Sequence, residues 1–288
     1  MKLKNIFLAT AVIGMGLFWA CAKNSTPAPP IHDTVTVHKT DTFLKPVDTP
    51  NLKIGLLLYL PFNGSFADSS GNANPTAAST GTTLTYDMHG YSSSAYGDNG
   101  GGHYVLVTNN GSIKFDTAYS ISFDFMQRSP GLQAFLSMVN YTTGYGPSFT
   151  VGTTNPGLPN FDIGINDSTA GCDNYGLTDP NKMSDTTTFI PQSERWYNAI
   201  CTYRKGSVSV YINGQLISTK TSTGTHAHVC PSAQIVVGGW WSGGAESING
   251  VLDEVRLYNR VLSAKEISWL SRNFQPSSTK VRATPVTR

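Results

Sequence analysis

The most constraining feature of the sequence is a two-residue alternation of apolar and polar side chains that recurs in short runs. In the clearest run, residues 119–126, aromatic and aliphatic residues alternate with Ser and Asp. Successive side chains of a strand point to opposite faces, so this run predicts a strand with one buried face. A second run, residues 207–212, leads into Asn213-Gly214, the strongest short signal for a hairpin.

About a dozen such strands are expected, with one short helix near the C-terminus. The other predicted strands cover residues 54–60, 103–107, 134–139, 148–151, 161–165, 197–203, 215–219 and 235–238, and part of the stretch 249–260. A chain of 288 residues has room for one large domain, and no repeat or second domain is visible. Many short strands in one domain predict an all-β fold, a two-sheet antiparallel jelly-roll sandwich.

The stretch Asn249–Arg260 places a carboxylate where an apolar residue belongs. At a period of two, Asp253 shares a strand face with Val251, Val255 and Leu257. Burying an unpaired charge is costly, so Asp253 needs backbone donors, a cationic side chain or a metal ion as its partner.

A helix start follows this strand. Ser263 is the expected N-cap, Glu266 completes a capping box, and Leu262 with Ile267 forms a hydrophobic staple. This segment is the one short helix that the sequence predicts.

The closing stretch resembles the last motif of laminin-G-like domains, concanavalin A-like jelly rolls in which "G-x-x-D-E-V-R-x-Y-x-R-x-L-S" recurs. Residues 58–64 with 68–72 resemble the opening strand and loop of that family, and residues 196–214 resemble its central hairpin. The three matches occur in family order over roughly residues 54–270. They imply the jelly-roll fold but leave function open, because this fold serves sugar binding, protein binding and, in distant relatives, glycoside hydrolysis.

The resemblance also implies a structural calcium ion. Related jelly rolls often bind calcium between the first strand's loop and the closing strand's aspartate. Asp253 would then be the inner ligand, and Asn63 and Asp68 would supply oxygens from the opening loop. The alternative is that Asp253 and Asp68 each accept backbone N–H groups and hold no metal.

The N-terminus reads as an export signal. Lys2 and Lys4 precede an apolar run that ends before Ala20-Cys21. This junction resembles a bacterial lipobox, which implies an acylated Cys21 at the mature N-terminus. Ordinary signal-peptidase cleavage is the alternative. We therefore expect a lipid-anchored protein of the cell envelope, at the outer membrane.

Composition sets the remaining boundaries. Residues 1–20 form the expected lipoprotein signal peptide, residues 21–50 a Pro- and Thr-rich tether, residues 51–274 the laminin-G-like domain, and residues 275–288 a disordered basic tail. Residues 51–274 hold 12 Lys and Arg against 15 Asp and Glu, a balance of −3. A nucleic-acid partner is therefore not expected.

No catalytic signature stands out. Glycoside hydrolysis usually needs two carboxylates about 5–10 Å apart, and no such pair can be named, although one involving an aspartate such as Asp162 stays open. His226, His228 and Cys230 could form a zinc site, but a solvated hairpin tip explains them more simply. We predict no catalytic residues.

Trp240-Trp241 is the predicted ligand site. The pair follows a strand end and precedes two glycines, and an exposed indole is a natural platform for a sugar ring. Because neighbouring residues of an extended segment point oppositely, one indole should be buried and the other available. Core packing is the alternative for the pair, and Trp196 and Trp269 are expected in the core.

The remaining cysteines allow at most one intramolecular disulfide in an oxidising compartment. Cys172 and Cys230 lie in loop-like segments and are the expected pair, whereas Cys201 lies inside a predicted strand and should be a buried thiol.

These features together predict a monomeric, non-catalytic envelope lipoprotein that binds a glycan or a glycosylated surface. Two alternatives stay open: a structural or adhesive protein-binding module without a sugar site, and a glycoside hydrolase.

Overall fold

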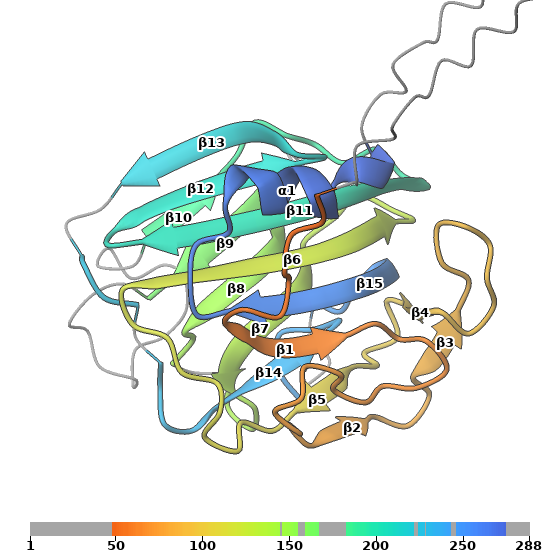
Figure 1. The fold of residues 1–288 in the computed structure, drawn as a ribbon. Coiled ribbons are helices and arrows are strands. Elements are labelled where there is room, and N and C mark those ends of the chain that lie inside the picture. The colour runs from red at the N-terminus through yellow and green to blue at the C-terminus, as the bar shows by residue number, and fades with distance from the viewer. Residues whose placement is uncertain are drawn as a thin grey trace, which may run out of the picture. The chain divides into compact units, whose positions relative to one another are not determined.

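Two antiparallel sheets stack face to face in the computed structural model (Figure 1), which describes residues 48–144, 146–154, 159–166, 183–221, 224–227, 229–242 and 246–274. The predicted signal peptide, nearly all of the predicted tether and the predicted basic tail lie outside these residues, so those boundaries stay predictions. The prediction of an all-β, two-sheet jelly roll with one short C-terminal helix is confirmed.

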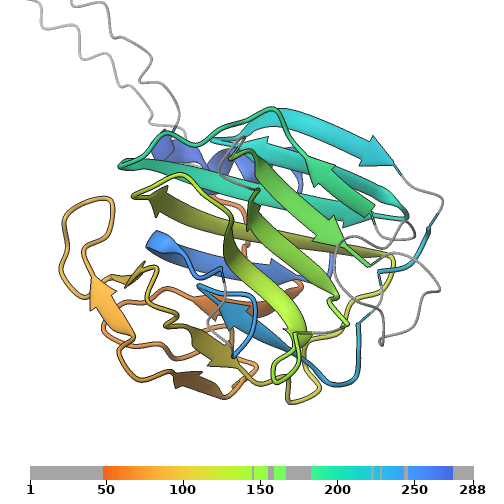
Figure 2. The same cartoon turned by 180° about the vertical axis from the view of Figure 1, so that it is seen from behind.

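Sheet A has eight strands. Their order is β13 (Gln215–Thr221), β12 (Ser207–Ile212), β11 (Arg195–Arg204), β6 (Ala118–Gln127), β15 (Asn249–Tyr258), β4 (Ala95–Asn99) and β3 (Thr83–Thr85), and β1 (Leu56–Leu60) also pairs with β15. Sheet B has seven: β10 (Met183–Thr186), β9 (Phe161–Ile165), β8 (Phe149–Thr153), β7 (Gln133–Asn140), β14 (Ala233–Val237), β5 (Val105–Val107) and β2 (Thr76–Ala78). Figure 2 shows the molecule from behind, with sheet B toward the viewer.

The main core lies between the two sheets. Phe125 of β6 and Phe135 of β7 join the sheets at a ring-centroid distance of 5.0 Å, and Phe161 of β9 packs against both. The polar face of β6 is buried as well, including Ser120 and Asp124. The prediction of one buried face on this strand is therefore wrong, because other segments cover the outer face of sheet A.

Helix α1 (Ala264–Leu270) is one of those covering segments (Figure 1). A second apolar cluster joins Ile267 and Leu270 of α1 to Ile200 of β11 and Tyr258 of β15. The predicted capping box is confirmed, since Ser263 and Glu266 exchange both hydrogen bonds. A short 3₁₀ helix, η1 (Arg272–Phe274), follows. Among the described residues, no helix is long and apolar enough to cross a membrane.

A β-bulge in β15 changes the predicted facing of Asp253. The pairing of β15 with β6 shifts between Asp253 and Arg256, and Glu254 has a φ of 53°. A bulge adds one residue to a strand and so reverses the alternation beyond it. As a result Val255 and Leu257 belong to the core, whereas Asp253 lies on the outer face of sheet A. The predicted common face for these three residues is wrong.

Candidate functional site

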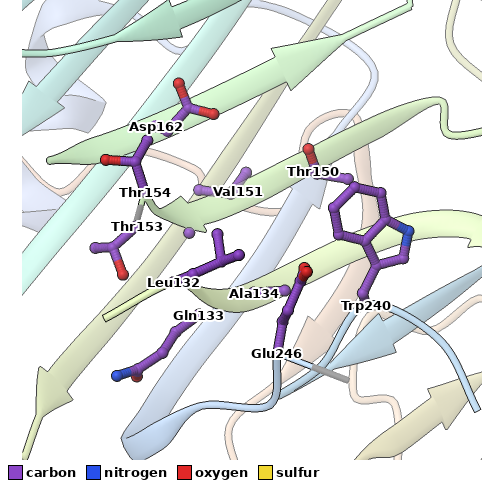
Figure 3. A pocket seen from close by; sticks show the side chains of 11 residues that line it. Leu132, Gln133, Ala134, Thr150, Val151, Thr153, Thr154, Asp162, Trp240 and Glu246 are labelled. Carbon is purple, nitrogen blue, oxygen red and sulfur yellow. The ribbon is translucent and has the colours of Figure 1, made fainter. Parts of the chain in front are cut away.

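A small pocket lies on the outer face of sheet B, beside the loop that follows β14 (Figure 3). Phe149 and Ile163 point into the core, so Thr150 of β8 and Asp162 of β9 point outward. We call this the Trp240 pocket; its lining residues are Leu132, Gln133, Ala134, Thr150, Val151, Gly152, Thr153, Thr154, Asp162, Trp240 and Glu246. Its volume is about 50 Å³.

The floor of the Trp240 pocket depends on a close approach of β7 to β8. The pairing of these strands shifts between Ala134 and Leu136, and a Cβ atom at Gly152 would lie 1.9 Å from the carbonyl oxygen of Gln133. Only glycine permits this backbone contact. The wall forms because the Ala134 N–H donates to the carbonyl of Glu246 at 2.7 Å, which holds the Glu246 segment against β7.

Trp240 and Trp241 are both partly buried, so the prediction of one buried and one available indole is wrong. The chain at this point is a bend rather than an extended strand, and both rings contact Gly144. The Trp240 Nε1–H donates to the Gly144 carbonyl at 3.2 Å. The Trp241 ring lies over Gly144, where an added Cβ would be 3.1 Å from Trp241 Cγ. Trp240 lines the pocket and Trp241 does not.

The Trp240 pocket is acidic. Of the described residues that line it, two are ionisable, Glu246 and Asp162, and Figure 3 shows Asp162 across the pocket from Trp240. Burial raises the pKa of Glu246 above its ordinary value. The Thr186 hydroxyl donates to Asp162 Oδ1 at 2.7 Å. Carboxylates and a hydroxyl beside an aromatic ring suit an uncharged, hydroxyl-rich ligand and disfavour an anion.

Sequence reasoning found Trp240 but did not place Glu246 in this site. Glu246 reaches the pocket through a parallel bridge between Ser247 and Ala134, which are far apart in the chain. No local sequence pattern predicts such a long-range contact. The glycines after Trp241 that motivated the loop prediction lie outside the described residues.

The three predicted calcium ligands are not brought together. Asp68 Oδ1 accepts the N–H groups of Tyr59 (3.0 Å) and Ser70 (2.9 Å), and its Oδ2 accepts Asn74 Nδ2 at 2.7 Å. Burial raises the pKa of Asp68, but hydrogen bonds from Ser70 and Tyr59 outweigh burial and hold this pKa below its usual value. This carboxylate already has protein donors and does not fit an ion held by Asp253.

Asp253 and Asn63 instead line a second, larger pocket of about 370 Å³ outside sheet A. We call it the carboxylate pocket; it is lined by Leu52, Asn63, Asp87, Met88, His89, Tyr91, Asp124, Asn198, Asp253, Glu254, Arg256, Trp269, Leu270, Arg272 and Asn273.

Trp269 is only partly buried here, and Trp196 is partly buried too, so their predicted core positions are wrong. Within the described ranges, no three His, Cys, Asp or Glu side chains are grouped to hold a metal ion. Calcium at Asp253 stays a prediction.

Two carboxylates face each other at the base of this pocket. Asp253 of β15 is the direct cross-strand partner of Asp124 of β6, and both are buried. Burial and the nearby Glu254 raise the pKa of Asp253 to about 8. Burial also raises the pKa of Asp124 to about 7, against the effect of a hydrogen bond from Asn198.

The predicted cysteine sites are only partly described. Cys230 is buried and disulfide-bonded, while Cys201 is a buried free thiol. Cys172 and the lipidation site Cys21 lie outside the described residues, so the Cys172–Cys230 pair and the lipid stay predictions. His226 pairs with Asp116 at 2.6 Å, and His228 is not described. With Cys230 in a disulfide, the zinc alternative loses its thiolate ligand.

Several solved structures share this fold. The binding domain of Paraclostridial Mosquitocidal Protein 1 matches with a TM-score of 0.57 and 18% identity, over 78% of this chain and 53% of that one. A second match is domain 4 of AbnA, a GH43 extracellular arabinanase from Geobacillus stearothermophilus, solved in complex with arabinotriose. Its TM-score is 0.57 and its sequence identity 17%, and the match covers 75% of this chain and 98% of that one. A third match is a structure of botulinum neurotoxin type C, whose cell entry depends on two ganglioside molecules. Its TM-score is 0.56 and its sequence identity 15%, and the match covers 77% of this chain and 52% of that one.

These similar structures are mostly receptor-binding or other binding domains, together with one domain of an arabinanase. The chain spans about half the length of the toxin domains that it matches. No curated protein sequence matches it. A sequence profile of the concanavalin A-like lectin/glucanases superfamily matches residues 99–268, more than half of the chain. The chain therefore belongs to the concanavalin A-like lectin/glucanases superfamily.

Proposed function

We propose that this domain is a non-catalytic carbohydrate-binding module and that the Trp240 pocket is its contact site. The observation that carries the proposal is a partly exposed indole in one pocket with two carboxylates and the Thr150 hydroxyl. The indole face offers apolar contact to the C–H groups of a sugar ring, and the oxygens accept its hydroxyl groups.

The similar structures support binding as the role. The arabinanase domain was solved with arabinotriose, and the type C neurotoxin depends on gangliosides for cell entry. A synaptotagmin complex of a related toxin domain shows that the same fold also binds protein. Among the described residues, the Trp240 pocket is lined by carboxylates and by no Lys, Arg or His, so we expect it to prefer neutral glycans to sialylated ones.

Glycoside hydrolysis is the second candidate, because Asp162 and Glu246 line one pocket and burial raises the pKa of Glu246, as a general acid requires. The size of the pocket argues against it. A volume of about 50 Å³ admits one or two hydroxyl-sized groups rather than a sugar ring between two carboxylates. If wild type releases sugar from a bound glycan and Glu246→Gln does not, the domain is an enzyme.

The test of binding is calorimetry on wild type, Trp240→Ala and the matched control Trp241→Ala, using a neutral glycan selected on an array. If the indole is an anchor, Trp240→Ala should weaken binding by about 1–3 kcal/mol. Trp241→Ala removes an equally large ring outside the pocket, so it should leave the affinity near wild type. Melting curves verify folding. Equal losses from both variants, or none from either, would favour the protein-binding module.

We also propose that the domain is held at the cell envelope, in the outer membrane, by lipid on Cys21. The charged leader, the short apolar run and the Ala20-Cys21 junction support this. Cys21→Ser removes the acylated sulfur, so the variant should leave the membrane fraction while wild type stays in it. A variant that still fractionates with membranes means that something other than this lipid holds the protein.

A further inference from the structure

The carboxylate pocket contains acceptors that lack donors. Asp124 accepts one hydrogen bond, from Asn198 Nδ2 at 2.7 Å, and Asp253 accepts one, from the Glu254 N–H at 2.8 Å. Among the described residues, no other donor reaches either carboxylate. Asn198 is 1% exposed and lines the pocket, and its Oδ1 has no partner among those residues. Buried oxygens without donors are costly in a folded protein.

The nearby cations are engaged elsewhere. Arg256 pairs with Glu254, and its guanidinium lies 4.1 Å from the centre of the Tyr59 ring. Arg272 donates to the Trp269 carbonyl at 2.7 Å and lies over the Trp269 ring at 4.4 Å. Both arginines lower the pKa of Asp124 through space without a hydrogen bond to it. In the part of the chain that the structure describes, the two facing carboxylates therefore have no cation in direct contact.

The size of the pocket decides between a metal ion and an organic cation. About 370 Å³ falls within the range of small-molecule sites, roughly 300–1,000 Å³, and far exceeds a single ion. Tyr91 and Trp269 line the same pocket and offer aromatic surface to an organic ligand. Arg256 and Arg272 would oppose a dication but tolerate a ligand with acceptor groups beyond its charged end.

We propose that the carboxylate pocket binds the primary ammonium group of a small polar molecule. An ammonium group has three N–H donors, and Asp124 and Asp253 supply charged acceptors for them beside Asn198, whose Oδ1 lacks a partner among the described residues. Charge-assisted hydrogen bonds to two carboxylates would relieve the repulsion between these cross-strand partners. The ammonium could come from an amino sugar or from a lysine side chain, since both present it at the end of a polar molecule.

Calorimetry on the full chain tests the proposal with paired probes. Glucosamine is compared with N-acetylglucosamine, which keeps the ring but lacks the charge. Nα-acetyl-lysine amide is compared with Nα-acetyl-norleucine amide in the same way. At least one amine should bind and its uncharged counterpart should not; the amine that binds identifies the source. If neither amine binds at millimolar concentration, or the uncharged probes bind equally well, the proposal is wrong.

Variants locate the binding. Asp124→Asn and Asp253→Asn keep the acceptor for their present donors but lose the charge, so each should weaken amine binding about tenfold or more. Asp116→Asn alters an exposed carboxylate outside the pocket and should bind as wild type does. Trp240→Ala should also bind the amine normally, which separates this site from the proposed glycan site. Unaltered binding in both pocket variants, or stabilisation by calcium alone, would overturn the proposal.

Discussion

At the scale of single residues, Asp253 and Asp124 make the stability of the domain depend on pH. Burial raises the pKa values of both groups, to about 8 and about 7. Between the pKa of an unfolded aspartate, about 3.9, and these values, the folded state binds more protons than the unfolded state. Stability is therefore highest below about pH 4 with respect to these groups and falls as pH rises through the folded pKa values.

Asp253→Asn should remove much of this loss. Without ligand, the variant should match wild type near pH 4 and exceed it at pH 8.5 by at least about 1 kcal/mol, since one pKa unit corresponds to about 1.4 kcal/mol. Asparagine still accepts the Glu254 N–H, so the bulge should persist. Urea unfolding at both pH values measures the difference, with the exposed Asp116→Asn as control. A variant less stable at pH 8.5 would mean that a cation, such as the predicted calcium, satisfies Asp253 in wild type.

The sequence predicted that Asp253 needs a partner but not which way it points. That need follows from the residue type alone, because a carboxylate in a buried strand must be satisfied. The face to which Asp253 points depends on the positive φ of Glu254, 53°. A glutamate in the sequence does not predict a positive φ. Asp124, the residue opposite, was visible only as one polar position of an alternating strand.

At the scale of elements, the cap of α1 is a closed network that can be tested. Glu266 accepts from Ser263 and pairs with Arg260, at 2.6 Å between Nη2 and Oε1. The hydrogen bond from Arg260 lowers the pKa of Glu266 to about 2, although burial opposes this. Stability from this carboxylate is therefore present above its unfolded pKa and is lost as pH falls through about 2.

Ser263→Ala should destabilise the domain by about 0.5–2 kcal/mol, as loss of an N-cap does. The effect should appear as a lower midpoint in urea at pH 7. Ser268→Ala, an exposed position of the same helix, is the matched control and should be neutral or slightly stabilising. A Ser263 variant as stable as its control would show that packing of Ile267 and Leu270, rather than the cap, holds α1.

Element types followed from local patterns, whereas element irregularities did not. The cap residues and the Asn213-Gly214 turn lie within a few positions of each other, and both turn residues adopt the positive φ values, 52° and 76°, that such hairpins need. The bulge in β15 lies in its pairing with β6, which is far away in the sequence, and the register shift in β7 lies in its pairing with the next strand, β8. These bulges orient Asp253 and shape the floor under Trp240, so both pockets depend on features that alternation alone does not predict.

At the scale of the whole molecule, the two-sheet fold could be predicted because apolar and polar side chains alternate in several strands, such as β6, β9 and β12. The sites could not be predicted to the same extent. The carboxylate pocket joins β6, β11, β15, the end of α1 and the segment after it, and Asn198, whose Oδ1 lacks a partner among the described residues, lies in a strand that reads simply as core. Such a site is defined by strand order and register, which a single sequence does not contain.

A disulfide bond at Cys230 adds a covalent constraint to the fold. Cys230 is disulfide-bonded and Cys201 is free and buried, and burial raises the pKa of the Cys201 thiol, so iodoacetamide should not modify it in the native protein. We predict that the partner is Cys172. Breaking a bridge over such a loop should cost about 4 kcal/mol in the chain-entropy model. Urea unfolding of Cys230→Ala should show this loss of stability. Cys201→Ala should lose only the stability that comes from packing of the buried Cys201 side chain. A non-reducing peptide map that joins Cys230 to any cysteine other than Cys172 would refute the assignment.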